Sequence, residues 1–292
     1  MEPALAEESV LRLHDGRALG YAEYGDPRGM PLIFFHGMPG SRYGGAILDE
    51  PARRAGVRVI SPDRPGFGLS DFQPRRTLLD WPSDVSELAD ALDLSRFAVM
   101  GVSSGGAYVA ACALRLPKRL RSAHIVSGAG PMDAPGATDG MMRMNKIMWT
   151  LSRRAPFVAS TLWRLVARAA RGNPERAANP AKSSMPPADQ RVFERPDVQA
   201  VFARELREAF RTGWRGAAHD ARLSATPWMF RLEDIEMRVS LWQGEEDLNV
   251  PPSMGRYQAQ AISDCLARFF PGEGHAGWVN HIDELLEMAK TA

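Results

Sequence analysis

The chain has little of the features that mark several specialised classes of protein. It has only two cysteines among its 292 residues, Cys112 and Cys265, which lie far apart and form no C-x-x-C spacing. Disulfide frameworks and structural zinc sites need more cysteines or regularly spaced ones. We therefore expect a fold that depends on a hydrophobic core, with no structural metal.

An excess of charge of one sign is also missing. The 36 Lys and Arg residues are balanced by 35 Asp and Glu residues, and the formal net charge of +1 argues against nucleic acid as a partner. The N-terminus is acidic where a signal peptide is basic. No run approaches the roughly 18 apolar residues of a membrane span. We expect a soluble, cytoplasmic protein that acts on a small molecule, with no membrane partner and an oligomeric state that the sequence leaves open.

Strand and helix patterns alternate along much of the chain, of which 45% is hydrophobic. The expected strands are residues 10–13, 18–24, 31–35, 57–60, 97–102, 123–127, 239–243 and 267–270. The expected helices between and after them are residues 81–92, 106–116, 254–262 and 278–289. The first two strands join at Asp15-Gly16, a hairpin signal. The later alternation predicts a parallel sheet with helices on both faces.

This alternation stops for about 100 residues, which are helical in composition, broken by prolines and without a convincing strand. We expect a core formed by residues 1–131 and 236–292, and an inserted helical cap at residues 132–235, which we call the insertion. Residues 134–232 contain 17 Lys and Arg against 8 Asp and Glu. Such a surface consists either of ordinary solvated helix faces or of a face that attracts an anionic substrate or partner.

One serine stands in a context typical of a nucleophile. The segment Gly101-Val102-Ser103-Ser104-Gly105 joins an expected strand to an alanine-rich helix. So sharp a turn strains the backbone of its central residue, and Cβ atoms two positions before and after would collide. Gly101 and Gly105 occupy these positions around Ser103, whereas Ser104 would need a small residue in place of Val102. Ser103 is the candidate nucleophile, and a Gly/Ser turn without chemistry is the alternative.

A serine nucleophile needs a base and an acid that orients the base. Of the six histidines, His36 and His275 follow the carboxyl ends of expected strands, where parallel sheets form their sites. The chain order serine, acid, histidine selects His275. Asp247, in the loop after the strand at residues 239–243, is the first choice for the acid. The alternatives left open are Glu245, Glu246 and Asn249 in the same loop, and Asp133 after an earlier strand.

A tetrahedral intermediate also needs two backbone N–H donors for its oxyanion. The N–H of Ser104 is one expected donor, because it lies at the start of the helix that follows the nucleophile. Met38, in the loop from His36 to Gly40, is expected to supply the other, since Pro39 has no N–H. The imidazole of His36 is expected to tie loops together rather than to react.

In order and spacing, these motifs resemble those of α/β-hydrolase-fold enzymes. The matching segments are His36-Gly37 with Pro39-Gly40, residues 63–70, residues 101–106, residues 244–251 and residues 272–275. The resemblance implies an eight-stranded, mostly parallel sheet flanked by helices, whose second strand runs antiparallel, with the cap over the site. It also implies the serine branch of that family, which holds carboxylesterases, C–C bond hydrolases, cofactor-free haloperoxidases and proline iminopeptidases. Haloalkane dehalogenases and epoxide hydrolases use an aspartate where this chain has Ser103.

We therefore expect a carboxylesterase that hydrolyses a small or medium ester through Ser103, His275 and Asp247, without a metal or organic cofactor. The residues expected to contact the substrate are Phe67, Met38 and Trp149. A C–C bond (diketone) hydrolase is one alternative. A proline iminopeptidase-like peptidase is another, although no convincing acidic cluster for a peptide amino terminus is present. A non-enzymatic ligand receptor is the third.

Overall fold

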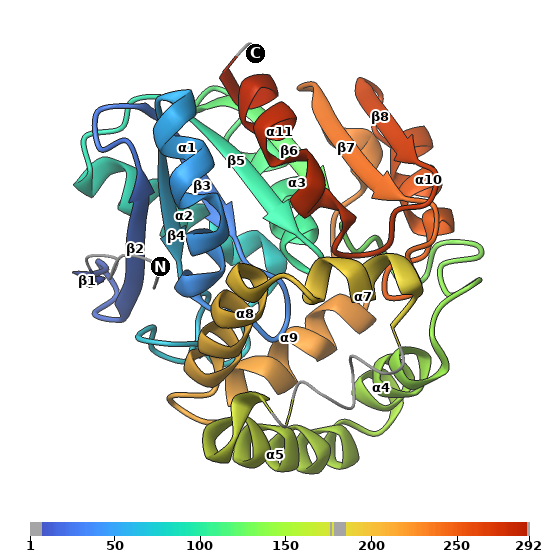
Figure 1. The fold of residues 1–292 in the computed structure, drawn as a ribbon. Coiled ribbons are helices and arrows are strands. Elements are labelled where there is room, and N and C mark those ends of the chain that lie inside the picture. Colours follow the sequence, from blue (N-terminus) through green and yellow to red (C-terminus); the bar gives the residue numbers. More distant parts are fainter. Residues whose placement is uncertain (1–7, 176, 178–184, 291–292) are drawn as a thin grey trace.

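A computed structural model describes residues 8–175, 177 and 185–290 of the chain. Its centre is an eight-stranded sheet with the strand order β1-β2-β4-β3-β5-β6-β7-β8 (Figure 1). The strands are β1 (Glu8–Arg12), β2 (Ala18–Gly25), β3 (Met30–Phe35), β4 (Val57–Pro62), β5 (Phe97–Val102), β6 (Leu120–Val126), β7 (Val239–Gly244) and β8 (Cys265–Phe270). Strand β2 runs antiparallel to both of its neighbours, and the other pairs are parallel. The expected α/β architecture is confirmed.

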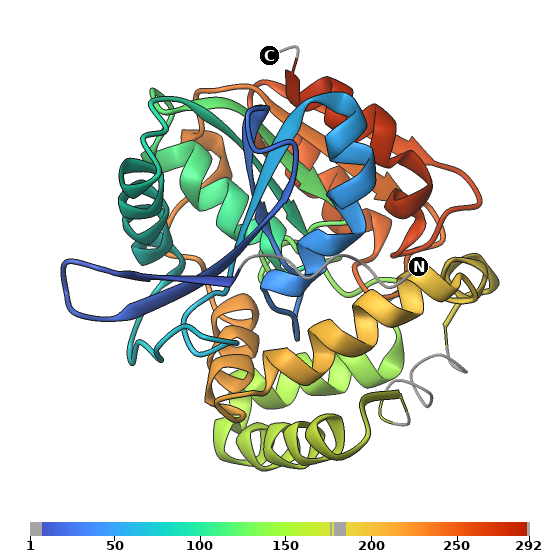
Figure 2. The ribbon, with the colours of Figure 1, turned by 60° about the vertical axis from the view of Figure 1, so that its left-hand side comes forward.

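Helices cover both faces of this sheet (Figure 2). The helices outside the insertion are η1 (Arg42–Leu48), α1 (Asp49–Ala55), η2 (Leu78–Asp80), α2 (Trp81–Ala91), α3 (Gly105–Arg115), α10 (Pro252–Ala261), η4 (Gly277–His281) and α11 (Ile282–Lys290). Helices α1 and α11 share one buried cluster with the sheet, while α2, α3 and α10 share the cluster on its other face. The central strands are therefore buried on both sides, as parallel strands usually are.

The alternation of side chains along β5 explains how one strand serves both clusters. Phe97 and Val99 belong to the cluster with α2 and α3, whereas Ala98, Met100 and Val102 belong to the cluster with α1 and α11. Successive side chains of a strand point to opposite faces of the sheet, so a continuous apolar run fills both. All six residues of β5 are buried. This rigid strand leads directly into Ser103.

The insertion folds as helices between β6 and β7, and its described residues contain no strand. Its helices are α4 (Arg143–Arg154), α5 (Pro156–Gly172), α7 (Pro187–Phe193), α8 (Pro196–Ala209), α9 (Arg215–Ala225) and η3 (Leu232–Asp234). Three of them begin at a proline, a residue that suits the first helical position because the N–H there has no partner in the helix. Figure 1 shows α4, α5, α7, α8 and α9 beyond the carboxyl ends of the strands, whereas Leu232 of η3 packs in the cluster on one face of the sheet.

Two details of the core differ from the sequence-based expectations. The segment between β3 and β4 forms η1 and α1, where no helix was expected. Glycines at 44 and 45 weaken helix propensity, but they allow close contacts: a Cβ at Gly44 would lie 2.4 Å from Glu205 Oε1, and one at Gly45 would lie 2.8 Å from Ser61 Cβ. The closing helix, expected to be continuous, begins instead as η4 before α11.

Candidate active site

The turn from β5 into α3 has the strained geometry that its glycines predict. Ser103 has a φ of +57°, in the left-handed region that disfavours residues other than glycine. A Cβ at Gly101 would lie 2.3 Å from Gly105 O, and one at Gly105 would lie 2.4 Å from Phe35 O. Neither position can therefore accept a side chain without moving the backbone.

Hydrogen bonds to the neighbouring segments hold this turn in place. Ser103 N donates to Val126 O at 3.0 Å, while Ser103 O accepts from Gly106 N at 3.0 Å and from Ala129 N at 2.8 Å. The strained backbone is thus fixed between β6 and the first turn of α3. Surrounding structure of this kind is what allows a residue to persist at an unfavourable φ.

His275 pairs with Asp247, one of the acids that the sequence left open. His275 Nδ1 lies 2.8 Å from Asp247 Oδ2, which also accepts from Gln243 Nε2 at 3.0 Å. The other oxygen, Oδ1, accepts the backbone N–H groups of Asn249 at 2.8 Å and Val250 at 2.9 Å. An ionised carboxylate can only accept, so Nδ1 carries the proton and Nε2 is the basic nitrogen.

The other candidate acids do not contact His275. Asp133 is exposed after β6, as are Glu245 and Glu246 in the loop after β7, and Glu245 pairs with Arg256 at 3.0 Å. Asn249 contributes its backbone N–H to Asp247 rather than its side chain to the histidine. The geometry therefore favours Asp247 among the acids that the sequence left open.

The electrostatic surroundings of His275 favour its charged form. Burial alone would lower the pKa of the imidazole, but the carboxylates of Asp247 and, more weakly, Asp189 outweigh burial and raise that pKa. The side chain is 18% exposed, whereas that of Asp247 has no exposed surface. No hydrogen bond between Ser103 Oγ and His275 is present in the described part of the chain, and such contacts often tighten only with substrate.

The loop from His36 to Gly40 passes next to Ser103. A Cβ at Gly37 would lie 3.4 Å from Ser103 Cβ and 3.9 Å from Ser103 Oγ. Within residues 8–175, 177 and 185–290, no hydrogen-bond acceptor is found for the backbone N–H of Met38 or of Ser104. Both N–H groups thus lack a partner among the described residues, and their role as oxyanion donors stays a prediction.

Comparison with known proteins places this geometry in a family. Residues 30–281 match the model of the family described as alpha/beta hydrolase fold. The chain belongs to the α/β-hydrolase family.

Relatives of this α/β-hydrolase differ in the reactions that their names state. The chain is 34% identical over 108 residues to 2-hydroxymuconate semialdehyde hydrolase of Pseudomonas sp. (strain CF600), covering 35% of this chain and 38% of that protein. It is 33% identical over 144 residues to lipase 1 of Psychrobacter immobilis, covering 45% and 44%. The chain therefore spans less than half the length of these curated relatives. A hydrolase from Pseudomonas aeruginosa PA01 has the same fold, with a TM-score of 0.70 at 20% identity over 99% of this chain and 100% of that one.

Arg64 of this α/β-hydrolase lies in the segment of residues 63–70 that resembles a family motif, but the sequence does not indicate its contacts. It is fully buried and donates from Nη2 to Gly37 O at 3.1 Å and to Ser104 Oγ at 3.0 Å. Its Nε donates to Asp220 Oδ2, on α9 of the insertion, at 2.9 Å. One guanidinium therefore links the two segments that carry the expected oxyanion donors. A motif shows that such a residue is present, but not which loops it joins.

His36 serves the same framework. Its Nδ1 donates to Gly37 O at 2.7 Å, and its Nε2 accepts from Arg64 N at 3.1 Å. Burial, reinforced by the Arg64 guanidinium, holds the pKa of His36 well below its usual value. A neutral imidazole with both nitrogens in use joins two loops of the α/β-hydrolase core.

Asp189, on α7 of the insertion, contacts the histidine loop and was not singled out from the sequence. Its Oδ1 accepts from Ala276 N at 2.7 Å, and a Cβ at Gly274 would lie 2.4 Å from the same oxygen. Its Oδ2 is buried without a hydrogen-bond partner among the described residues. Burial raises the pKa of this carboxyl group. No local signal in a helix could have revealed this contact, because it arises only when α7 meets the loop.

The expected substrate contacts stay predictions. Phe67 has no exposed surface, and its ring lies edge-on to His36 with centroids 5.2 Å apart. Met38 packs against the cluster that contains Phe67. Trp149 lines an open cavity of about 240 Å³ that does not include Ser103. The other residues of this cavity are Met132, Thr138, Lys146, Thr150, Arg153, Arg154 and Ala225.

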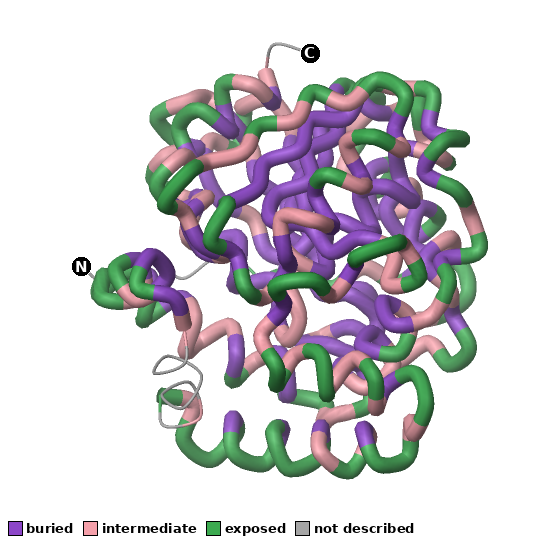
Figure 3. Tube along the Cα trace, turned by 90° about the vertical axis from the view of Figure 1, so that its right-hand side faces the viewer, coloured by how far each residue is buried: buried purple, intermediate pink, exposed green. Residues whose placement is uncertain are grey.

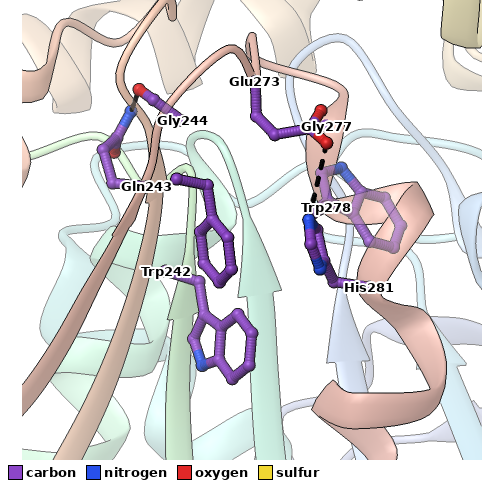
Figure 4. Close-up of a pocket in the computed structure, with 8 residues that line it drawn as sticks. Trp242, Gln243, Gly244, Glu273, Gly277, Trp278 and His281 are labelled. Atoms are coloured by element: carbon purple, nitrogen blue, oxygen red, sulfur yellow. Dashed lines mark hydrogen bonds and ion pairs between the residues drawn. The ribbon is translucent and has the colours of Figure 1, made fainter.

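A second cavity lies behind the loop that carries His275 (Figure 4). Its volume is about 10 Å³, the space of roughly one water molecule, so it cannot hold a substrate. Trp242 stacks on Phe270 with ring centroids 5.3 Å apart, and Glu273 lies 3.5 Å from His281. These contacts lie on both sides of the loop that carries His275. Within the described residues, no group of His, Cys, Asp and Glu side chains is arranged to hold a metal ion.

Proposed function

We propose that this α/β-hydrolase is a serine carboxylesterase that acts through an acyl-enzyme. The observation that carries the proposal is the pairing of His275 with the buried Asp247, together with a serine held at a φ of +57° at the end of β5. A strained serine, a base with its free nitrogen and a buried acid are the groups that acyl transfer requires. The similarity to a protein named lipase supports an ester substrate.

The first half of the reaction forms the acyl-enzyme. His275 Nε2 accepts the proton of Ser103 Oγ as that oxygen attacks the ester carbonyl carbon. Asp247 stabilises the imidazolium that results, and the backbone N–H groups of Met38 and Ser104 donate to the oxyanion. The N-terminus of α3 adds a favourable dipole. His275 then gives its proton to the leaving alcohol as the ester bond breaks.

The second half reverses these roles with water as the nucleophile. His275 accepts a proton from water, the hydroxyl attacks the acyl carbon, and the collapse of the second tetrahedral intermediate returns a proton to Ser103 Oγ. The products are a carboxylic acid and an alcohol. None of these steps requires a group beyond the residues named.

Ser103→Ala, compared with Ser95→Ala at an exposed site, tests the nucleophile. We expect Ser103→Ala to lose on the order of 10⁴-fold or more in kcat on a short-chain aryl ester, while Ser95→Ala keeps the wild-type rate. A fluorophosphonate should label the wild-type protein and Ser95→Ala but not Ser103→Ala. Turnover by Ser103→Ala would show that the nucleophile is wrong, and an unlabelled wild type would favour a ligand receptor.

Hydrolysis of a C–C bond is the second candidate, because a relative is named 2-hydroxymuconate semialdehyde hydrolase. The same serine, histidine and acid can serve that reaction. Comparing kcat/KM for aryl esters and for vinylogous diketones separates the two. A preference for the diketones would replace the esterase assignment and leave that of Ser103 in place.

A further inference from the structure

Helix α5 lies at the outer edge of the insertion, and α4 packs beside it (Figures 1 and 2). From residue 140 to residue 174 the chain has no Asp or Glu, although it has seven Lys and Arg residues. These cations are Arg143, Lys146, Arg153, Arg154, Arg164, Arg168 and Arg171. Charge of one sign is thus concentrated here, in a protein whose net charge is only +1.

The same two helices also expose large apolar side chains. Six of the ten exposed large hydrophobic residues in the described part of the chain lie on them. They are Met144 (63% exposed), Ile147 (43%), Phe157 (89%), Val158 (51%), Leu165 (59%) and Val166 (39%). Scattered surface apolar residues need no explanation, whereas exposed apolar residues that gather in one region are typical of interaction surfaces. We call these six residues and the seven cations the α4–α5 face.

The helical period places apolar and cationic residues on one side of α5. Its buried residues are Ala159, Trp163, Ala167 and Ala170, which share one side of the helix. Phe157, Leu165 and Arg168 lie on the opposite side of the helix and are exposed to solvent. In Figure 3 the lowest helix, α5, is buried toward the molecule and exposed along its underside.

Several cations of this face lack an ion-pair partner among the described residues. Arg153, Arg154 and Arg168 have no ion pair with any residue that the structure describes, whereas Arg164 lies over the ring of Trp214 at 5.0 Å. Nucleic acid would use the cations but not the aliphatic side chains between them. An anionic lipid layer uses both, since apolar groups enter the acyl boundary while Lys and Arg meet the headgroups.

We propose that the α4–α5 face binds the surface of an anionic phospholipid membrane. The helices would lie on the membrane rather than cross it: α4 has 12 residues and α5 has 17, and no described helix is long and apolar enough to span. The lack of an apolar run of roughly 18 residues excludes a spanning segment. It does not exclude helices that lie in the interface plane.

Sedimentation with phospholipid vesicles tests this proposal. We expect the protein to bind vesicles that contain phosphatidylglycerol and not vesicles of phosphatidylcholine alone, with binding that weakens as salt rises. A variant with Arg153→Gln, Arg154→Gln and Arg168→Gln should bind about tenfold more weakly or worse. A variant with Phe157→Ser and Leu165→Ser should show a loss of about tenfold as well, because its apolar anchors are gone.

Matched substitutions elsewhere on the surface serve as controls. Lys118→Gln with Arg121→Gln removes exposed cations outside the insertion, and Val10→Ser removes an apolar side chain that is 55% exposed on β1. These controls should bind vesicles like the wild type. All variants should keep the circular dichroism spectrum of the wild type and unfold cooperatively on heating, which shows that they are folded.

Three results would overturn the proposal. The first is equal binding, or none, to the two kinds of vesicle. The second is unchanged vesicle binding by both sets of α4–α5 variants. The third is concentration-dependent self-association without vesicles that Phe157→Ser with Leu165→Ser abolishes, because a second copy of the chain would then cover this face.

Discussion

Replacing Asp247 by asparagine tests the candidate site at its most constrained atom. Oδ1 of Asp247 accepts two backbone N–H groups, from Asn249 and Val250, so the amide oxygen of an asparagine must take that position. The NH₂ group must then replace Oδ2, where it faces Nδ1 of His275 and the amide nitrogen of Gln243. Donors would face donors at both contacts.

The histidine can relieve this conflict by moving its proton to Nε2. Nδ1 then accepts from the asparagine, but Nε2 is no longer a base for Ser103. Loss of the correct tautomer and of the charge that stabilises the imidazolium lowers kcat by about 10³- to 10⁴-fold in triads of this kind. That factor corresponds to about 4 to 5.5 kcal/mol of transition-state stabilisation.

Steady-state hydrolysis of an aryl ester measures the effect. Glu246→Gln is the control, because it removes an exposed carboxylate from the same loop with no contact to the histidine among the described residues. It should keep kcat within twofold or so, as surface substitutions usually do. Thermal unfolding checks that both variants are folded. If Asp247→Asn kept kcat within tenfold while folded, the pairing of His275 and Asp247 would not serve catalysis.

Two further substitutions probe carboxylates of the insertion. Asp189→Asn should move the acid limb of the kcat/KM profile to lower pH, because one of the charges that raise the pKa of His275 is removed while the acceptor for Ala276 N is kept; an unmoved limb would contradict this. Burial raises the pKa of Glu205 from 4.5 to about 8, so its contribution to stability is complete below pH 4.5 and is lost as the pH rises to 8. Glu205→Gln should remove this loss, which is up to about 1.4 kcal/mol in the free energy of unfolding per pH unit. Urea unfolding at pH 4.5 and at pH 8 measures it. If the free energy of unfolding changed equally with pH in the wild type and the variant, the prediction would be refuted.

The parts of the site that follow from sequence are those set by local geometry. Gly101 and Gly105 are needed because backbone atoms lie within 2.4 Å of the Cβ positions they lack, and that constraint is visible as a spacing of glycines around Ser103. The boundaries of β5 agree with the expected strand for a similar reason. A strand buried on both faces must be apolar throughout, so the ends of its apolar run predict where the strand begins and ends.

The parts that sequence could not supply depend on contacts between distant segments. Asp189 and Asp220 are carboxylates on helices without a motif, 86 and 55 residues before His275 in the chain. Their roles appear only when α7 and α9 meet the core loops. The partner of His275 also depends on such a contact. Several carboxylates follow the carboxyl ends of the strands, and only the structure shows which of them contacts His275.

These contacts make the insertion part of the site's support. On one side, Asp189 holds the loop of His275 through Ala276 N. On the other, Asp220 binds Arg64, which contacts Gly37 O and Ser104 Oγ beside the expected oxyanion donors. Arg64 and Arg76 outweigh burial and keep the pKa of Asp220 well below its usual value, so this link is charged at any physiological pH. A displacement of the insertion would therefore disturb the loop of His275 and the loop of Gly37 together. A partner that contacts the insertion from outside, as we propose for lipid at the α4–α5 face, would act on helices packed against α9, which carries Asp220.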